Sequence, residues 1–424
     1  MEALRYFDYQ GKMKESSVLH RNITPASLAK MNLSRQKTKS ILTILSLSLG
    51  GVLVVLISTM LISYDGVAET RGKEFPVGEF NIQLNANQSW DTADVSLAGL
   101  QQKDLLNADF ENAIESMDGV TGTKRWYYTD AEYRVNDYDD NWIYGLAKED
   151  VSALKENLIA GTVDYHELVS KNGIILIQDT AENLSLSAQL GDSVEVDFLT
   201  KSGKTITKSY TIMGIVSNFS HPAFNMCFAM PEELMNEACE MDCSGTISVI
   251  TEAEKADTVE ASLNKLIDGN SDLVMDTIEE SITYYSRNQQ LPFGALLIVA
   301  IIVVCFSFIN LVNTTITNFL SRRQEIGMLQ AIGLSKKQLI RMLCYEGLIY
   351  SAFATLVTLL LGAGLGFLCV QAVKTMNPYF YYSFPWLVAW IYLGLLLIVQ
   401  FILISYTTGN LKKQSLVEQI RTTE

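Results

Sequence analysis

The sequence has few of the residues from which metal sites and catalytic centres are usually built. It contains three histidines and six cysteines in 424 residues. No Cys-x-x-Cys pair and no Cys/His spacing typical of a zinc site occurs. His20, His166 and His221 are far apart in the sequence, and no nucleophile elbow or zinc-binding helix is present. We therefore expect no metal and no cofactor.

A nucleotide-binding loop is also absent. Gly203, Lys204 and Thr205 resemble the end of a phosphate-binding loop, but the glycine required five residues earlier is replaced by Phe198. Alternating apolar and polar residues on both sides predict a hairpin turn at this place. With no catalytic constellation in view, we expect a protein that is not itself an enzyme.

The cysteines offer one unresolved pairing. Cys305, Cys344 and Cys369 fall in or beside long apolar runs, where a small polarizable side chain is ordinary packing. Cys239 and Cys243 are four residues apart in a segment that predicts a helix, 231–243. The sequence leaves open whether these two form a disulfide.

Long apolar runs are the dominant positive feature. Hydrophobic residues make up 48% of the chain, and about 20 apolar residues suffice to cross the hydrocarbon layer of a membrane. Four segments reach that length once the last apolar stretch is divided at Lys374, Asn377 and Pro378. We predict spans at residues 41–62, 291–316, 343–373 and 386–407.

The charges predict how these spans are oriented. Residues 1–39 hold eight Lys/Arg and three acids, and residues 317–343 hold five basic residues and one acid. Residues 63–290 hold 15 basic and 40 acidic residues. Short basic loops stay in the cytoplasm, so we predict a multi-pass cell-membrane protein with both termini inside and residues 63–290 outside. Solubility explains this acidity more simply than binding of cationic ligands does.

The long outer segment has the pattern of a folded domain. Residues 80–84 alternate in polarity, and Val194, Val196 and Phe198 predict a half-buried strand that returns as a second strand near 206–218. The predicted fold is an α-helical membrane protein with four transmembrane helices and an inserted mixed α+β extracytoplasmic domain. Its predicted parts are a leader (1–39), the first span (40–62), the outer domain (63–290) and a C-terminal part that holds the other three spans (291–424).

The segment between the second and third spans is basic and structured. We expect residues 321–327 to continue the second span as a helix, with Arg322 and Arg323 free to hold lipid phosphates or a partner's acidic side chains. Gly333 ends that helix, and Ser335 is suited to cap a short helix, 336–342, lying along the membrane. The alternative is an ordinary basic loop. The glycine break and the neighbouring apolar residues favour a docking element.

Three further residues stand out within the spans. Glu346 is the only acid there, and a central charge would cost roughly 2.5–3.5 kcal/mol. Its place near the inner end favours a structural brace, paired with a nearby arginine, over a proton site. Gly362 and Gly366 have the Gly-x-x-x-Gly spacing of close helix packing; we expect that packing within the chain rather than between subunits.

These residues together resemble a known family. The run RRQEIGMLQAIGLSKKQLIRMLCYE (322–346) is similar to the motif of FtsX/MacB-type permeases of ABC transporters. LAKMNLSRQKTKSILTILSLSLG at the first span and LGDSVEVDFL with YTIMGIVSN in the outer domain extend the resemblance over nearly the whole chain. Gln330 departs from the pattern, because the family usually has a basic residue there.

The resemblance implies a function and partners. It implies a permease dimer working with two cytoplasmic ATPase subunits, in which 335–342 is the coupling helix and ATP-driven motion passes to the outer domain. Export or handling of peptides, antibiotics or lipoproteins follows from the family. The implied ATPase-docking residues are Arg322, Arg323, Glu325, Leu334, Ser335, Lys336, Lys337 and Arg341.

Alternatives remain open at this point. TPASLAKMNL resembles the joint between the halves of a double-length permease, so the second permease could be a homologous half instead of a copy. A different function is an FtsX-like regulator that activates an extracellular cell-wall hydrolase or signalling partner. A membrane-anchored enzyme is the weakest alternative, because no site is visible. Beyond protein partners we expect contact with membrane lipid and none with nucleic acid.

Overall fold

The computed structural model describes residues 24–35, 37–86, 96–135, 138–222, 226–331 and 333–412. The chain divides into two compact units. The helical unit comprises Met1–Ser63 and Pro292–Glu424, and the α+β unit comprises Tyr64–Leu291. Most of the predicted leader lies outside the described residues.

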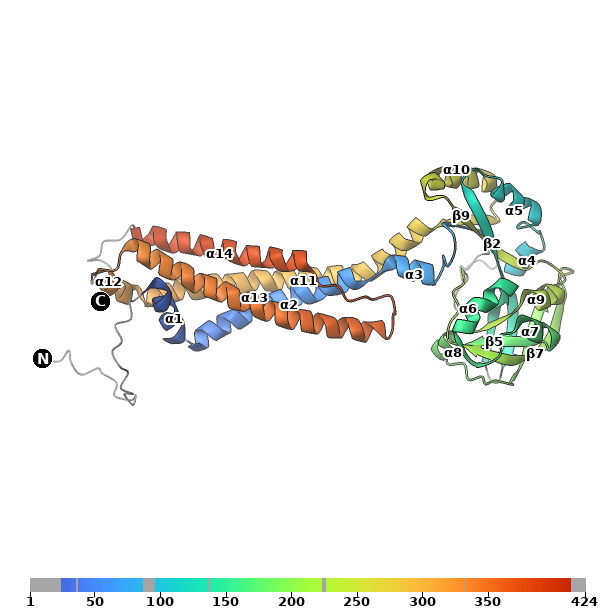
Figure 1. Ribbon diagram of the computed structural model, residues 1–424, viewed down its shortest axis with the longest axis horizontal. Helices are drawn as coiled ribbons and strands as arrows, with labels where there is room; N and C mark the ends of the chain where they lie inside the picture. Colours follow the sequence, from blue (N-terminus) through green and yellow to red (C-terminus); the bar gives the residue numbers. More distant parts are fainter. Residues whose placement is uncertain are drawn as a thin grey trace. The chain divides into compact units, whose positions relative to one another are not determined.

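The helical unit contains the predicted spans. Among the described helices, four are long and apolar enough to cross a membrane: α2 (Lys37–Ser63), α11 (Ile278–Ser321), α13 (Lys336–Lys374) and α14 (Trp386–Lys412). Two shorter helices, α1 (Pro25–Arg35) and α12 (Arg323–Ala331), lie at one end of this bundle (Figure 1). The predicted four-span class is confirmed.

Small residues let α2 and α13 pack closely. A Cβ atom added at Gly362 would lie 2.8 Å from Val55 Cγ1, and one at Gly366 would lie 3.1 Å from Thr59 Oγ1. Gly51 of α2 is as tightly enclosed, because a Cβ added there would lie 2.5 Å from Thr358 Oγ1. Such contacts are typical of membrane helices, which gain little from burying apolar surface and associate through close packing. In this structure both Gly362 and Gly366 face a helix of the same chain.

Hydrogen bonds supplement this packing. Tyr392 Oη of α14 donates to the Leu47 carbonyl of α2 at 2.6 Å. Ser307 Oγ of α11 donates to the Ser46 carbonyl at 2.8 Å, and Asn310 Nδ2 donates to Ser46 Oγ at 3.0 Å. These bonds join helix α2 to α14 and α11, and they satisfy polar groups that the bundle interior removes from water.

Gly362→Leu should destabilise the helical unit, because the added side chain would overlap Val55. Overpacking of this kind costs about 1–3 kcal/mol. We expect thermal unfolding of the full chain in detergent to shift down by several degrees. Gly364→Leu is the matched control, since no atom lies within 4 Å of a Cβ at Gly364. Equal effects of the two substitutions would contradict the packing role.

The α+β unit is built on one ten-stranded sheet among the described residues. Its strand order is β10-β1-β9-β2-β3-β8-β5-β7-β4, with β6 paired to β2 and β7. The strands are β1 (Phe80–Leu84), β2 (Val120–Val135), β3 (Tyr138–Leu146), β4 (Leu158–Gly161), β5 (Gly173–Ile177), β6 (Ser193–Leu199), β7 (Thr205–Val216), β8 (Phe228–Pro231), β9 (Ser244–Thr251) and β10 (Leu273–Thr277). The long strand β2 pairs with β3, β6 and β9 and so joins the two halves of the sheet.

Short helices cover the sheet and close two apolar cores. They are α4 (Leu97–Gln101), α5 (Ala108–Glu115), α6 (Val151–Glu156), α7 (Tyr165–Ser170), α8 (Gln178–Asn183), α9 (Glu232–Cys239) and α10 (Ala256–Ile267). Helix α3 (Gly66–Gly72) precedes β1 in the chain. Val194, Val196 and Phe198 are fully buried in one core, as their alternation predicts. The strand at 80–84 and the hairpin of β6 with β7 are likewise confirmed.

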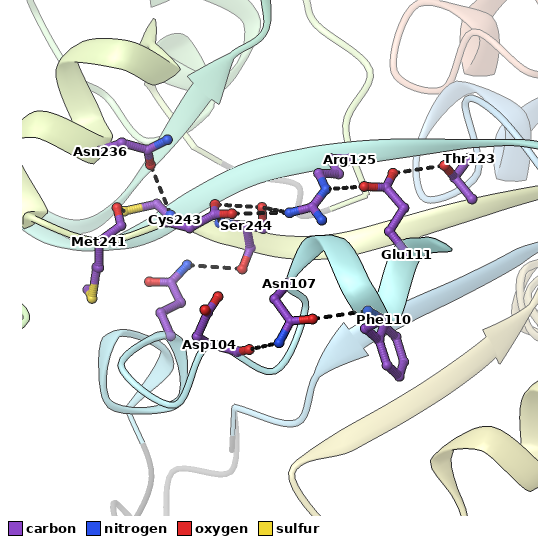
Figure 2. Close-up of polar contacts among 12 residues, drawn as sticks. Asp104, Asn107, Phe110, Glu111, Thr123, Arg125, Asn236, Met241, Cys243 and Ser244 are labelled. Atoms are coloured by element: carbon purple, nitrogen blue, oxygen red, sulfur yellow. Dashed lines mark hydrogen bonds and ion pairs between the residues drawn. The ribbon is translucent and has the colours of Figure 1, made fainter. Parts of the chain in front are cut away.

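A polar network ties β2 to the elements beside it (Figure 2). Arg125 Nε donates to Glu111 Oε2 of α5 at 2.5 Å, and Arg125 Nη1 donates to Asp242 Oδ2 at 3.1 Å. Thr123 Oγ1 donates to the other Glu111 oxygen at 2.8 Å. The side chain of Arg125 is 15% exposed. The carboxylates of Glu111 and Asp242 therefore offset the cost of removing its charge from water.

The cysteine segment differs from its prediction. Helix α9 ends at Cys239, and Glu240 has φ +56°, a left-handed conformation that stops the helix. Cys243 therefore lies beyond the helix, where its N–H donates to Asn236 Oδ1 at 2.9 Å (Figure 2). Both thiols are free and buried. Contact with Cys239 and burial raise the pKa of the Cys243 thiol.

The carboxyl group of Glu232, in the α+β unit, has a raised pKa. Burial, followed by repulsion from Asp150 and Glu149, raises the pKa of Glu232 from 4.5 to about 7. Its Oε2 atom is buried and has no hydrogen-bond partner among the described residues. The fold therefore favours the protonated form. The stabilisation that this gives is complete below pH 4.5 and is lost as the pH rises through 7.

Glu232→Gln should remove this pH dependence, because glutamine stays neutral. At about pH 8 we expect the variant to melt at a higher temperature than the wild type, and at about pH 4.5 the two should melt alike. The measurement is thermal unfolding of the full chain at both pH values. Glu254→Gln, at an exposed position, is the control and should leave the difference between pH values unchanged. A lower melting temperature for Glu232→Gln at the higher pH would disprove the assignment.

Candidate functional site

The short helices of the helical unit form a compact end with the start of α13. We call α1, Arg322, α12 and residues 333–346 the basic end. Ala29 of α1, Ile326 of α12, and Leu339 and Met342 of α13 form one buried apolar cluster. Each is at most 2% exposed. This cluster fixes the three helices against one another and so determines where their charged residues lie.

Glu346 is the polar centre of the basic end. Arg322 Nη1 lies 3.3 Å from Glu346 Oε1, and Asn32 Nδ2 of α1 donates to the same oxygen at 2.7 Å. The side chains of Arg322 and Glu346 are each 15% exposed. A charge at this depth is costly unless a charged partner and further hydrogen bonds compensate for the lost water. Both are present, from two different parts of the chain.

A second ion pair lies nearer the surface. Arg35 Nη2 of α1 contacts Glu325 Oε1 of α12 at 2.5 Å, and Arg322 Nε lies 4.0 Å from the other Glu325 oxygen. Arg35 is 70% exposed. An exposed pair of this kind contributes little stability. The pair nevertheless gives the Glu325 carboxylate an ion-pair partner within the same chain.

A small cavity adjoins Glu346. Its volume is about 60 Å³, and Asn318, Tyr350 and Gln400 are among its lining residues. Space of that size suits one or two water molecules. Gln400 Nε2 is buried and has no hydrogen-bond partner among the described residues. In the part of the chain that the structure describes, no group of three His, Cys, Asp or Glu residues could hold a metal ion.

The predicted docking residues fall into three groups. Lys336, Lys337 and Arg341 are exposed and make no ion pair with any described residue. Arg322 and Glu325 form ion pairs with other residues of the chain, Arg322 with Glu346 and Glu325 with Arg35. Two of the remaining residues have a structural role: Leu334 packs against the apolar cluster, and Ser335 caps α13. The side chain of Arg323 lies outside the part of the chain that the structure describes.

The start of α13 is closed by a side-chain cap. Ser335 Oγ accepts from the Gln338 N–H, and Gln338 Oε1 accepts from the Ser335 N–H at 2.9 Å, a reciprocal capping box. Gly333 has φ +115°, which only glycine adopts without strain. The predicted N-cap and glycine break are both confirmed. Lys336 and Lys337 therefore project from a fixed first turn.

Two expectations about helix extent are wrong. The helix of the second span does not continue through 321–327: α11 ends at Ser321 and α12 begins at Arg323. The interruption turns Ile326 into the apolar cluster and Arg322 toward Glu346. The separate short helix at 336–342 is absent, because α13 runs unbroken to Lys374. No proline follows Ser335 before that point, and glycine is tolerated inside membrane helices.

The sequence reasoning missed the part played by α1. Asn32 and Arg35 bond to Glu346 and Glu325, which lie 314 and 290 residues further along the chain. Ala29, Asn32 and Leu33 have the spacing of one helix face, and this was the available signal. It could not show which distant helix that face would contact.

The long apolar helices around this end belong to a known type of domain. Residues 297–416 match the family described as FtsX-like permease C-terminal. The chain carries an FtsX-like permease domain. That domain holds the later part of α11 and all of α12, α13 and α14, and therefore the basic end except α1. No curated protein sequence matches the chain significantly.

Two solved structures are similar to part of the chain. One is the periplasmic region of MacB from Actinobacillus actinomycetemcomitans, with 13% identity, a TM-score of 0.31, and coverage of 51% of this chain and 95% of that one. The other is the extracellular domain of the noncanonic ABC-type transporter YknZ from Gram-positive bacteria. It has 14% identity, a TM-score of 0.28, and coverage of 47% and 100% respectively.

The partly buried pair of the permease domain should be strongly coupled. Arg322→Met or Glu346→Met alone leaves one charge without its partner, and we expect each to destabilise the full chain by about 1–3 kcal/mol. The double variant should lose less than the sum of the two. Thermal unfolding in detergent measures this cycle. Arg35→Met, at the exposed pair, is the control and should cost less than about 1 kcal/mol. Strict additivity would refute the pairing.

Proposed function

We propose that this chain is the non-catalytic permease subunit of an ABC transporter, with its basic end docked on a cytoplasmic ATPase dimer. The observation that carries the proposal is the set of three exposed cations at the capped start of α13: Lys336, Lys337 and Arg341. They stand on a packed cluster, so force applied there is not absorbed by a loose loop. An acidic surface on the ATPase would complement them.

The charge distribution supports the orientation that this function needs. The basic end would face the cytoplasm under the positive-inside rule, and residues 63–290, with 40 acids against 15 basic residues, would lie outside. ATP hydrolysis would then occur on the side where nucleotide is available, in the partner subunits. The second permease of the dimer would be another copy or a homologous half.

Helix α11 is suited to transmit motion. It belongs to the α+β unit over residues 278–291 and to the helical unit from Pro292 onward. Proline inside a helix removes one hydrogen bond and favours bending at that place. A shift at the basic end would pass along α11 to the α+β unit, which would act on a peptide, antibiotic or lipoprotein outside the membrane.

Lys336→Glu combined with Lys337→Glu should uncouple the transporter, because the reversed charges would repel an acidic docking surface. We expect the ATPase that co-purifies with the wild-type chain to be lost from the variant, or to lose its stimulation by at least about tenfold. Association and ATP hydrolysis in nanodiscs are the two measurements. Expression and melting temperature should stay unchanged.

The matched control is Lys37→Glu combined with Lys39→Glu. These lysines are exposed at the start of α2 and change the charge equally. Coupling should survive in this control. Wild-type coupling in the Lys336/Lys337 variant, or equal loss in both variants, would count against docking at α13. Normal secretion after gene deletion, together with loss of a cell-wall hydrolase activity, would favour the regulator instead.

A further inference from the structure

We propose that the α+β unit binds an organic cation, an amine or guanidinium group attached to an aromatic or apolar body, in a cavity beside β1 and β10. The cavity has a volume of about 490 Å³ and is lined by both strands, by the first turns of α11, and by residues of β2 and β3. Ligand pockets of small molecules typically measure about 300–1,000 Å³. The inference does not depend on the docking of an ATPase.

Carboxylates give the cavity its charge. Glu74, Asp276 and Glu280 line it, and no lysine, arginine or histidine is among the described residues that do so. The lysine next in sequence to Glu74 is Lys73, which is engaged by Glu69 at 2.6 Å. The cavity therefore carries an excess of negative charge that the described residues leave without an ion-pair partner.

Neutral hydrogen bonds hold two of these carboxylates in position. Glu74 accepts from Ser281 Oγ at 3.0 Å and from Tyr285 Oη at 2.8 Å. Asp276 accepts from Gln83 Nε2 at 2.6 Å. Such bonds orient a carboxylate without neutralising it. Burial first, then repulsion from Glu74 and Glu280, raises the pKa of Asp276, and a bound cation would relieve that repulsion.

Aromatic rings form another part of the wall. Trp142 stacks on Tyr128 with 5.9 Å between ring centroids and 24° between planes. Tyr284 of α11 is 61% exposed and also lines the cavity. The faces of tryptophan and tyrosine attract cations, and their area accommodates an apolar body. The combination of carboxylates and aromatic faces is suited to an organic cation.

A metal ion fits the cavity less well. Hard cations such as Ca²⁺ require about six to eight oxygen ligands close together. Within the described residues no three acidic, histidine or cysteine side chains are grouped closely enough to hold a metal. A cavity that is lined by both carboxylates and aromatic rings matches a ligand that joins a cationic group to an aromatic or apolar body. A basic residue of a peptide, or a small aromatic amine, has this chemistry.

The test is binding of the tripeptide Lys-Trp-Lys amide to the full chain in detergent, measured by calorimetry. Glu-Trp-Glu amide is the charge-reversed probe, and tryptamine is the probe for a small amine. We expect Lys-Trp-Lys amide to bind and Glu-Trp-Glu amide not to bind. Binding of tryptamine as well would identify a small amine as sufficient, whereas binding of the peptide alone would identify a peptide as the source of the cation.

Asp276→Asn combined with Glu280→Gln should weaken binding of Lys-Trp-Lys amide by at least about tenfold. Glu279→Gln combined with Glu254→Gln is the matched control, because it removes the same charge from exposed residues that do not line the cavity. A melting temperature no lower than that of the wild type would show that each variant is folded. Absence of binding to the wild type, equal affinity for the two tripeptides, or equal loss in both double variants would overturn the proposal.

Discussion

The arrangement of the basic end depends on one carboxylate that enters the helical bundle. Glu346 lies on a helix apolar enough to span a membrane, where an unpaired charge would be costly. Its partners must therefore come from other parts of the chain. Arg322 supplies the charge after α11 has ended, and Asn32 supplies an amide from α1. The interruption between α11 and α12 and the docking of α1 both serve this requirement.

Some positive charges of the basic end pair with acidic residues of the chain, and others are exposed without an ion-pair partner among the described residues. Arg322 forms an ion pair with Glu346, and Arg35 forms an ion pair with Glu325. Lys336, Lys337 and Arg341 remain available at the surface. The internal pairs and the apolar cluster give these cations a firm base. Residues that hold the end together are therefore distinct from those suited to meet a partner.

In the α+β unit, the charges without an ion-pair partner around the cavity are negative, whereas those at the basic end are positive. Arg125 of β2 is paired with two acidic partners, so the charges there are balanced within the fold. Around the cavity beside β10 the acids exceed the bases, and neutral donors hold Glu74 and Asp276 in place. An unbalanced group of this kind raises the free energy of the empty fold. That cost is offset when a ligand of opposite charge enters.

Sequence alone determined the features that follow from local patterns, and only the tertiary structure decided the rest. Apolar length identified four spans, strict alternation identified the strands at 80–84 and 193–199, and Ser335 with Gly333 marked the start of α13. The choice of Arg322 as partner of Glu346, and the contact of Asn32 with the same carboxylate, depend instead on which helices meet in space. The same holds for the cavity, whose lining residues come from separate parts of the sequence. Local propensities cannot specify such contacts between distant residues, because these contacts are set by packing and by the low dielectric of the buried regions.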